Sequence, residues 1–137
     1  MVGTGEDAGE IHNLASVLGI EHKVKFLGSR DDVPHILMAS DTFVMTSVFE
    51  GLSVVAVEAQ ASGLPCVFSD GMSEETKLNS NVCFVPLSEN SEKWADIILS
   101  TKNLSRITDI SALQKAGYDR NAPSSVQKEF LEYLYQK

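Results

Sequence analysis

Two glutamates, Glu50 and Glu58, have the residue type and spacing most suggestive of chemistry in this chain. Glu50 falls in a predicted turn, and Glu58 lies about five residues into a predicted helix, roughly 7–8 Å along its axis. A carboxylate beside apolar residues such as Val57 and Ala59 needs hydrogen-bond donors, because a buried charge without partners is costly. Sugar hydroxyls are such donors. Two other interpretations stay open: solvated surface residues, or an acid–base pair like that of glycoside hydrolases.

The elements around these carboxylates are a strand, a glycine turn and a helix. Residues 42–45 form a short apolar run with β-branched and aromatic side chains, which is typical of a buried strand. Gly51 supplies the turn, and we expect Ser53 to cap a helix that runs to about Ala61. The backbone N–H groups of such a helix start lie at the carboxyl end of the sheet, where they can bind an anion. The stretch therefore predicts a phosphate-binding turn.

The rest of the chain alternates strand-like and helical patterns. Predicted strands are a stub at Met1 and residues 24–27, 42–45, 65–68 and 82–85. Predicted helices are residues 6–18, ended by Gly19, then 33–39, 53–61, 91–99, 111–116 and 123–135. This alternation predicts an α/β fold with a Rossmann-like, doubly wound parallel sheet, an incomplete first strand and a helical C-terminus. No long linker divides the chain, so we expect one domain over residues 1–137.

Two further turns follow predicted strands and are candidate binding loops. Gly3 and Gly5 lie at a strand-to-helix turn, although the third glycine of a dinucleotide fingerprint is missing. A purely structural tight turn is the alternative, since acidic residues at that helix start would repel a phosphate. Ser29 and Arg30 follow residues 24–27, and the planar guanidinium of Arg30 suits either a base or a phosphate. The alternative there is a charged surface loop.

The composition excludes several classes of protein. A formal net charge of −8, from 11 basic and 19 acidic residues, argues against a nucleic-acid-binding surface. No apolar run approaches the roughly 20 residues that span a bilayer, and no signal-peptide pattern begins the chain. Cys66 and Cys83 lie in strand-like runs without metal-ligand spacing. We therefore expect reduced thiols, no bound metal and a cytoplasmic location.

These motifs together resemble those of a known family. Glu50 and Glu58, followed by Ala59, Ala61, Gly63 and Pro65, are similar to the hallmark of retaining nucleotide-sugar glycosyltransferases of family 4, also called group 1. The resemblance extends over residues 2–6, 24–28, 41–45, 49–65 and 69–70, and is nearest to transferases of bacterial capsular or exopolysaccharide assembly. These enzymes have the GT-B fold, in which two Rossmann-like domains face each other. The resemblance implies that this chain is the C-terminal, donor-binding domain of a longer enzyme.

The resemblance also implies roles for individual residues. Glu50 would contact the donor sugar, Glu58 would accept hydrogen bonds from the ribose, and the backbone N–H groups of Gly51, Leu52, Ser53 and Val54 would hold the diphosphate. Gly3 and Gly5 would border the donor pocket, and the loop of Ser29 and Arg30 would meet the base.

The implied donor is a nucleotide diphosphate sugar, with a UDP-sugar expected, and no other cofactor. An acceptor saccharide, free or lipid-linked, would be bound by an N-terminal domain, and the whole enzyme would associate peripherally with the inner face of the membrane. We expect the 137 residues alone to bind donor weakly and to transfer nothing. The alternative is a non-catalytic nucleotide-binding module of Rossmann type.

Overall fold

The computed structural model describes residues 1–51 and 53–118, so Leu52 and the predicted helix 123–135 lie outside the described residues. The chain divides into two compact units, Met1–Val33 and Pro34–Lys137, and each is described by itself.

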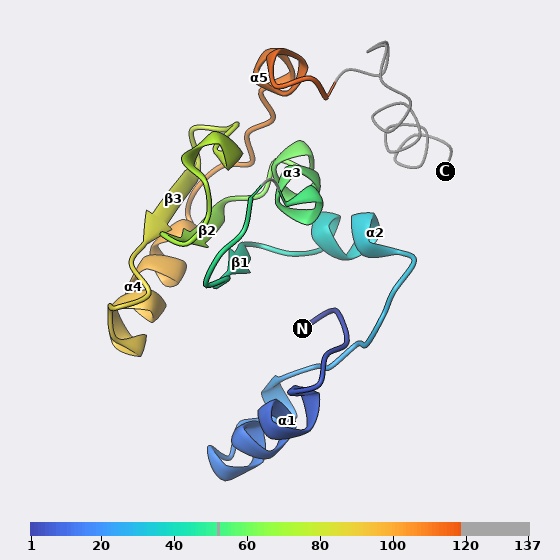
Figure 1. Cartoon of the computed structure of the whole chain (residues 1–137), viewed down its shortest axis with the longest axis vertical. Helices are drawn as coiled ribbons and strands as arrows, with labels where there is room; N and C mark the ends of the chain where they lie inside the picture. The colour runs from blue at the N-terminus through green and yellow to red at the C-terminus, as the bar shows by residue number, and fades with distance from the viewer. Residues whose placement is uncertain (52, 119–137) are drawn as a thin grey trace. The chain divides into compact units, whose positions relative to one another are not determined.

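Unit 2 is built on a parallel sheet of three strands in the order β1-β2-β3 (Figure 1). The strands are β1 (Phe43–Met45), β2 (Cys66–Ser69) and β3 (Val82–Val85). Phe43 pairs with Cys66, and Cys66 pairs with Val82, so the three strands begin side by side and their carboxyl ends share one edge. The predictions for all three strands are confirmed to within a residue or two.

Helices cover this sheet, as alternation of strand and helix predicts. Unit 2 contains α2 (Val33–Met38) from its second residue, α3 (Val54–Ala61), the 3-10 helix η2 (Glu74–Thr76), α4 (Ser91–Thr101) and α5 (Ile110–Lys115). α3 packs against β1 and β2, and α4 packs against β2 (Figure 1). All four residues of β2 are buried, so both of its faces are covered. The predicted fold class, a Rossmann-like parallel α/β sheet, is confirmed.

The core of unit 2 lies between β2 and the helices. Its largest fully buried apolar side chains include Phe68, Leu64 and Val67. Phe43, Phe68 and Phe84, one from each strand, form two edge-to-face ring pairs across the sheet. Such pairs add about 0.5–1.5 kcal/mol each beyond the burial of their apolar surface. The carboxyl ends of the strands, where the candidate site lies, thus rest on a well-packed aromatic core.

Unit 1 contains α1 (Ala8–Val17) and the 3-10 helix η1 (Glu21–Lys23). Gly19 has φ +67° and ends α1 as predicted, because glycine adopts this conformation without a Cβ penalty. The predicted strand at residues 24–27 is wrong as a regular strand. Leu27 N–H donates to the carbonyl of Met1 and Gly3 N–H to that of Gly28, so the pairing slips by one residue. Gly28 has φ +62°, outside the extended region, and this breaks the ladder.

Candidate functional site

The start of α3 presents backbone donors at the carboxyl end of β1. Ser53 occupies the N-cap position with extended backbone, but its side chain makes no capping hydrogen bond, so that part of the prediction is wrong. Its carbonyl accepts from Val57 N–H, which begins the helix. Within residues 1–51 and 53–118, no backbone carbonyl accepts from the N–H groups of Val54, Val55 or Ala56. Free N–H groups at a helix start can bind an anion, and the expected contacts of the Gly51, Leu52, Ser53 and Val54 N–H groups with a diphosphate stay a prediction.

Glu58 lies in the middle of α3 and is only 9 % exposed. Its neighbours Val57 and Ala59 are buried, so the apolar surroundings expected from the sequence are present. Burial raises the pKa of the Glu58 carboxyl above its ordinary value, because desolvation disfavours the charged form. Among the described residues, none forms a hydrogen bond or an ion pair with this carboxylate. Glu58 is therefore a largely buried side chain whose carboxylate lacks a donor in the described part of the chain.

Glu50 lies on the loop between β1 and α3 and is half-buried. Its backbone is held on both sides by the loop after β2: Glu50 N–H donates to the Gly71 carbonyl at 3.1 Å, and Ser73 N–H donates to the Glu50 carbonyl at 3.3 Å. Glu50 and Met72 thereby form a parallel bridge outside the named strands. No hydrogen bond or ion pair joins its carboxylate to any other residue in the described part of the chain. A fixed backbone with an unengaged carboxylate suits ligand binding.

Gly71 was not predicted as part of this site, yet it permits the contact between the two loops. A Cβ on Gly71 would overlap the Val48 carbonyl and lie 2.7 Å from the carbonyl oxygen of Ser47. Ser69 Oγ donates to that same Ser47 carbonyl at 2.5 Å. Only a residue without a side chain allows this approach. The signal in the sequence is a single glycine after a strand, which does not identify the partner loop.

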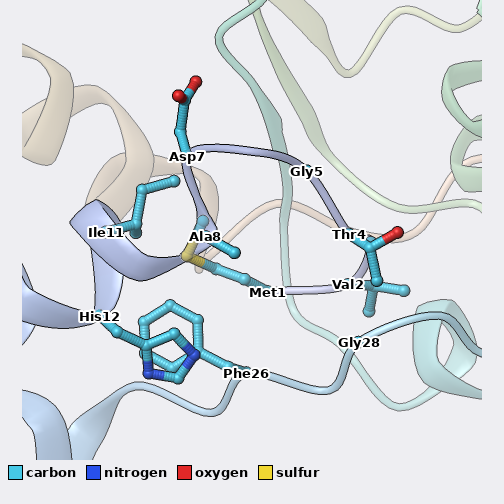
Figure 2. Close-up of a pocket in the computed structure, with 11 residues that line it drawn as sticks. Met1, Val2, Thr4, Gly5, Asp7, Ala8, Ile11, His12, Phe26 and Gly28 are labelled. Carbon is cyan, nitrogen blue, oxygen red and sulfur yellow. The ribbon is translucent and has the colours of Figure 1, made fainter.

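The predicted residues of unit 1 lie around two separate pockets. Gly3 and Gly5 line a pocket of about 690 Å³ together with Ile11, His12, Phe26 and neighbouring residues (Figure 2). Figure 2 shows the His12 ring lying over that of Phe26, with centroids 3.6 Å apart. Ser29 and Arg30 line another, smaller depression with Asp31 and Asp32. Gly3 and Gly5 therefore line one of these two pockets, and Ser29 and Arg30 line the other.

Arg30 is already engaged by a carboxylate. Its Nε and NH2 groups donate to the two oxygens of Asp32, each at 2.7 Å. This bidentate pair is exposed, so it contributes little to stability, and it raises the pKa of the Arg30 guanidinium. The Asp32 carboxylate also partly neutralises the positive charge to which a phosphate would bind. The arrangement leaves the flat face of the guanidinium as the surface best suited to a ligand.

The remaining sequence predictions concern cysteines, metals and membranes. Cys66 is buried, Cys83 is half-buried, and both carry free thiols. Burial raises the pKa of the Cys66 thiol to about 12. Over residues 1–51 and 53–118, no group of three or more His, Cys, Asp or Glu side chains is arranged to hold a metal ion. In the same residues, no helix has the length and apolar character required to cross a bilayer.

Comparison with known proteins identifies the class of protein to which this site belongs. Residues 1–102 match the family of glycosyl transferases group 1, and the chain belongs to that family. The family is one of transferases, so the alternative of a glycoside hydrolase finds no support in it. The resemblance inferred from Glu50 and Glu58 is confirmed at this level.

Individual relatives come from bacterial glycan biosynthesis. EpsF of Bacillus subtilis, described as a glycosyltransferase, is 40% identical over 99 residues, which are 72% of this chain and 26% of EpsF. The UDP-Gal:alpha-D-GlcNAc-diphosphoundecaprenol alpha-1,3-galactosyltransferase of Escherichia coli is 37% identical over 86 residues, 62% of this chain and 20% of that enzyme. The chain thus spans between a fifth and about a quarter of these relatives.

Solved structures give the same fold. Anabaena HepE in complex with UDP-glucose superposes with a TM-score of 0.67 at 27% identity, covering 99% of this chain and 40% of HepE. The same protein with UDP has a TM-score of 0.65 at 25% identity. The lipopolysaccharide outer core galactosyltransferase WaaB matches at 20% identity with a TM-score of 0.63, which supports the fold alone. The α/β fold of this chain is therefore one that GT-B glycosyltransferases contain.

Proposed function

We propose that this chain is the donor-binding domain of a retaining family 4 glycosyltransferase, which transfers a hexose from a UDP-sugar to a growing polysaccharide. The proposal places Glu50 against the donor sugar, Glu58 against the ribose, and the first N–H groups of α3 against the diphosphate. The residues predicted in unit 1, Gly3, Gly5, Ser29 and Arg30, stay predictions for binding of the nucleotide.

One observation carries this proposal: α3 combines unused donors with an unused acceptor. Its first turn offers the N–H groups of Val54, Val55 and Ala56, which find no acceptor among the described residues. About one turn further, the Glu58 side chain is largely buried, and its carboxylate has no donor among the described residues. A partly desolvated carboxylate without a donor is costly, and a ligand that supplies donors would offset that cost. A nucleotide diphosphate sugar carries both complements, since its phosphates accept hydrogen bonds and its ribose and sugar hydroxyls donate them.

The chemistry of transfer fits such a site. When the bond between the sugar and the diphosphate breaks, negative charge develops on the leaving phosphate. Preoriented N–H groups at a helix start stabilise that charge without reorganising during the reaction. Glu50 would hold the sugar hydroxyls so that the anomeric carbon stays near these donors. In this scheme neither glutamate abstracts a proton from the acceptor.

Similarity to named proteins supports the choice of donor and pathway. HepE binds UDP and UDP-glucose in its solved complexes, and the relative from Escherichia coli uses UDP-galactose, as its name states. The acceptor in that name is a sugar linked to diphosphoundecaprenol. We therefore favour a uridine nucleotide and a lipid-linked saccharide acceptor, with assembly of capsular or exopolysaccharide at the inner membrane face.

Calorimetric titration of the natural polypeptide with UDP and with UDP-glucose tests the division of roles. Glu58→Gln should weaken both ligands, because both contain ribose. Glu50→Gln should weaken UDP-glucose and leave UDP almost unchanged. Each loss should be roughly 10- to 150-fold, since a hydrogen bond to a charged group is worth about 1.5–3 kcal/mol. Glu92→Gln, an exposed glutamate in the first turn of α4, serves as the matched control.

Two outcomes would count against this proposal. Equal losses for both variants on both ligands would show that the carboxylates only maintain the loop. Tight binding of UDP-glucose without sugar transfer to any lipid-linked saccharide by the natural polypeptide would favour the non-catalytic nucleotide-binding module.

A further inference from the structure

A buried amide, that of Gln60, joins α3 to the segment that follows η2. Gln60 Nε2 donates to the carbonyls of Ala56 at 3.1 Å and Thr76 at 2.8 Å. Its Oε1 accepts from the backbone N–H groups of Leu78 at 2.8 Å and Asn79 at 3.1 Å. All four hydrogen-bonding positions of the amide are used, and the side chain is fully buried. Residues 76–79 are therefore fixed to the body of α3.

Thr76, within this fixed segment, reaches back to the turn before the same helix. Its Oγ1 donates to the Gly51 carbonyl at 3.3 Å, although 25 residues separate the two. Thr76 is fully buried, so water does not compete for this hydroxyl. The hydroxyl thus connects the turn before α3 to a segment that Gln60, near the end of α3, holds in place.

Packing of described side chains around Gly51 is open. Gly51 is exposed, and a Cβ built on it would have no atom within 4 Å. Over the described residues, the Thr76 hydroxyl is the side-chain group that bonds to the Gly51 backbone. The Gly51 carbonyl belongs to the turn that leads into α3, so a hydrogen bond to it restrains the entry to that helix. Control of this carbonyl therefore controls how the turn presents its donors.

We propose that Thr76 is a positioning residue for diphosphate binding, acting through the Gly51 carbonyl. The inference rests on the proposed function, which assigns the diphosphate to this turn. Thr76 itself touches no ligand in this scheme: its hydroxyl holds the Gly51 carbonyl, and Gln60 holds Thr76 in place. The donor site would then depend on two segments, the turn before α3 and the loop after β2 that carries Thr76. The family resemblance assigns no ligand contact to this second loop.

Substitution of Thr76 tests the inference in the natural polypeptide. Thr76→Val removes the hydroxyl at nearly constant volume and should weaken UDP about three- to tenfold, the range expected for one lost hydrogen bond. Thr76→Ser keeps the hydroxyl and should bind UDP within about twofold of wild type. UDP is the probe, in calorimetric titrations. If Thr76→Val does not fold, Thr76→Ala against Thr76→Ser makes the same comparison.

Thr101 provides a matched control in the same unit. It is also buried, its Oγ1 donates to the Ile98 carbonyl at 2.7 Å, and it bonds to the Thr42 hydroxyl just before β1. Thr101→Val therefore removes a buried hydroxyl at the amino end of the sheet, away from Gly51. It should lower stability while leaving UDP affinity unchanged. Equal UDP affinities for Thr76→Val and Thr101→Val would overturn the inference.

Amide hydrogen exchange gives a second readout that needs no ligand. In Thr76→Val, peptides covering residues 46–58 should exchange faster, because the turn loses its anchor, whereas peptides covering β3 should not change. Unchanged exchange over residues 46–58 would refute the positioning role. If wild type fails to bind UDP, the proposed function fails, and the exchange experiment still decides whether Thr76 holds the turn.

Discussion

Replacement of Gly71 by alanine should destabilise unit 2, because the loop before Glu50 occupies the space that a side chain would need. The added Cβ would lie 2.6 Å from the carbonyl carbon of Val48 and 2.7 Å from the carbonyl oxygen of Ser47, both below any ordinary contact. These atoms belong to the backbone, so no flexible side chain can move aside. Gly71 has no positive φ, so steric overlap is the cause rather than backbone strain. Overpacking of this kind costs about 1–3 kcal/mol.

Urea denaturation followed by tryptophan fluorescence measures this effect. Trp94, the single tryptophan of the chain, lies in α4 and reports on unit 2. Gly51→Ala is the matched control for stability, because its Cβ meets no atom within 4 Å and its φ is not positive. It should change the free energy of unfolding by less than about 1 kcal/mol. A Gly71→Ala protein as stable as Gly51→Ala would show that the two loops do not approach as closely as described.

Three further predictions concern charge and thiol chemistry. Since burial raises the pKa of the Glu58 carboxyl, the stability it contributes is present below the unfolded pKa of about 4.3 and is lost as pH rises through the folded value. Glu58→Gln should therefore gain more stability over wild type at pH 7 than at pH 4 in urea titrations, and an equal gain would contradict the assignment. Cys66, buried and with its pKa raised to about 12, should resist a thiol reagent at pH 8 until urea unfolds the chain; rapid native labelling, seen by mass spectrometry, would refute this. Arg106 donates to the carbonyls of Ser62 at 2.8 Å and Met38 at 2.9 Å, so Arg106→Met should lower the free energy of unfolding by about 1–2 kcal/mol. Arg30→Met is the control and should have almost no effect on that free energy, because the ion pair of Arg30 with Asp32 is exposed and screened by solvent.

The sequence predicted the elements of unit 2 because local pattern and tertiary burial agree there. β2 and β3 are short apolar runs: all four residues of β2 are buried, and in β3 Val82 and Val85 are buried while Cys83 and Phe84 are half-buried. The loop of Glu50 and the helix of Glu58 follow β1 as predicted, since a strand, a glycine and a helix former leave few alternatives. The same logic failed at residues 24–27, where Gly28 with its positive φ disrupts an otherwise strand-like run.

Contacts between distant loops could not be predicted from the sequence. The approach of Gly71 to Val48 joins two loops through backbone atoms, and no pattern of side chains encodes it. The bond from Thr76 to Gly51 spans 25 residues and depends on the register of β1 and β2. Ser53 has the residue type of a helix cap, yet type alone did not decide where its hydroxyl points. These features depend on how the loops pack once the sheet has formed.

Two buried polar residues of α3 show how structure separates a structural role from a binding role. Gln60 and Glu58 are two positions apart in the same helix, and both are buried polar residues. Gln60 uses all four of its hydrogen-bonding positions within the protein, so packing of the loop after η2 explains its burial. Glu58 uses none within the described residues, and burial raises the pKa of its carboxyl. A side chain that lowers the stability of the free protein is readily explained when a bound ligand supplies the hydrogen bonds that it lacks. In the proposed site the two ribose hydroxyls would donate these hydrogen bonds to Glu58, and the titration of Glu58→Gln with UDP tests this.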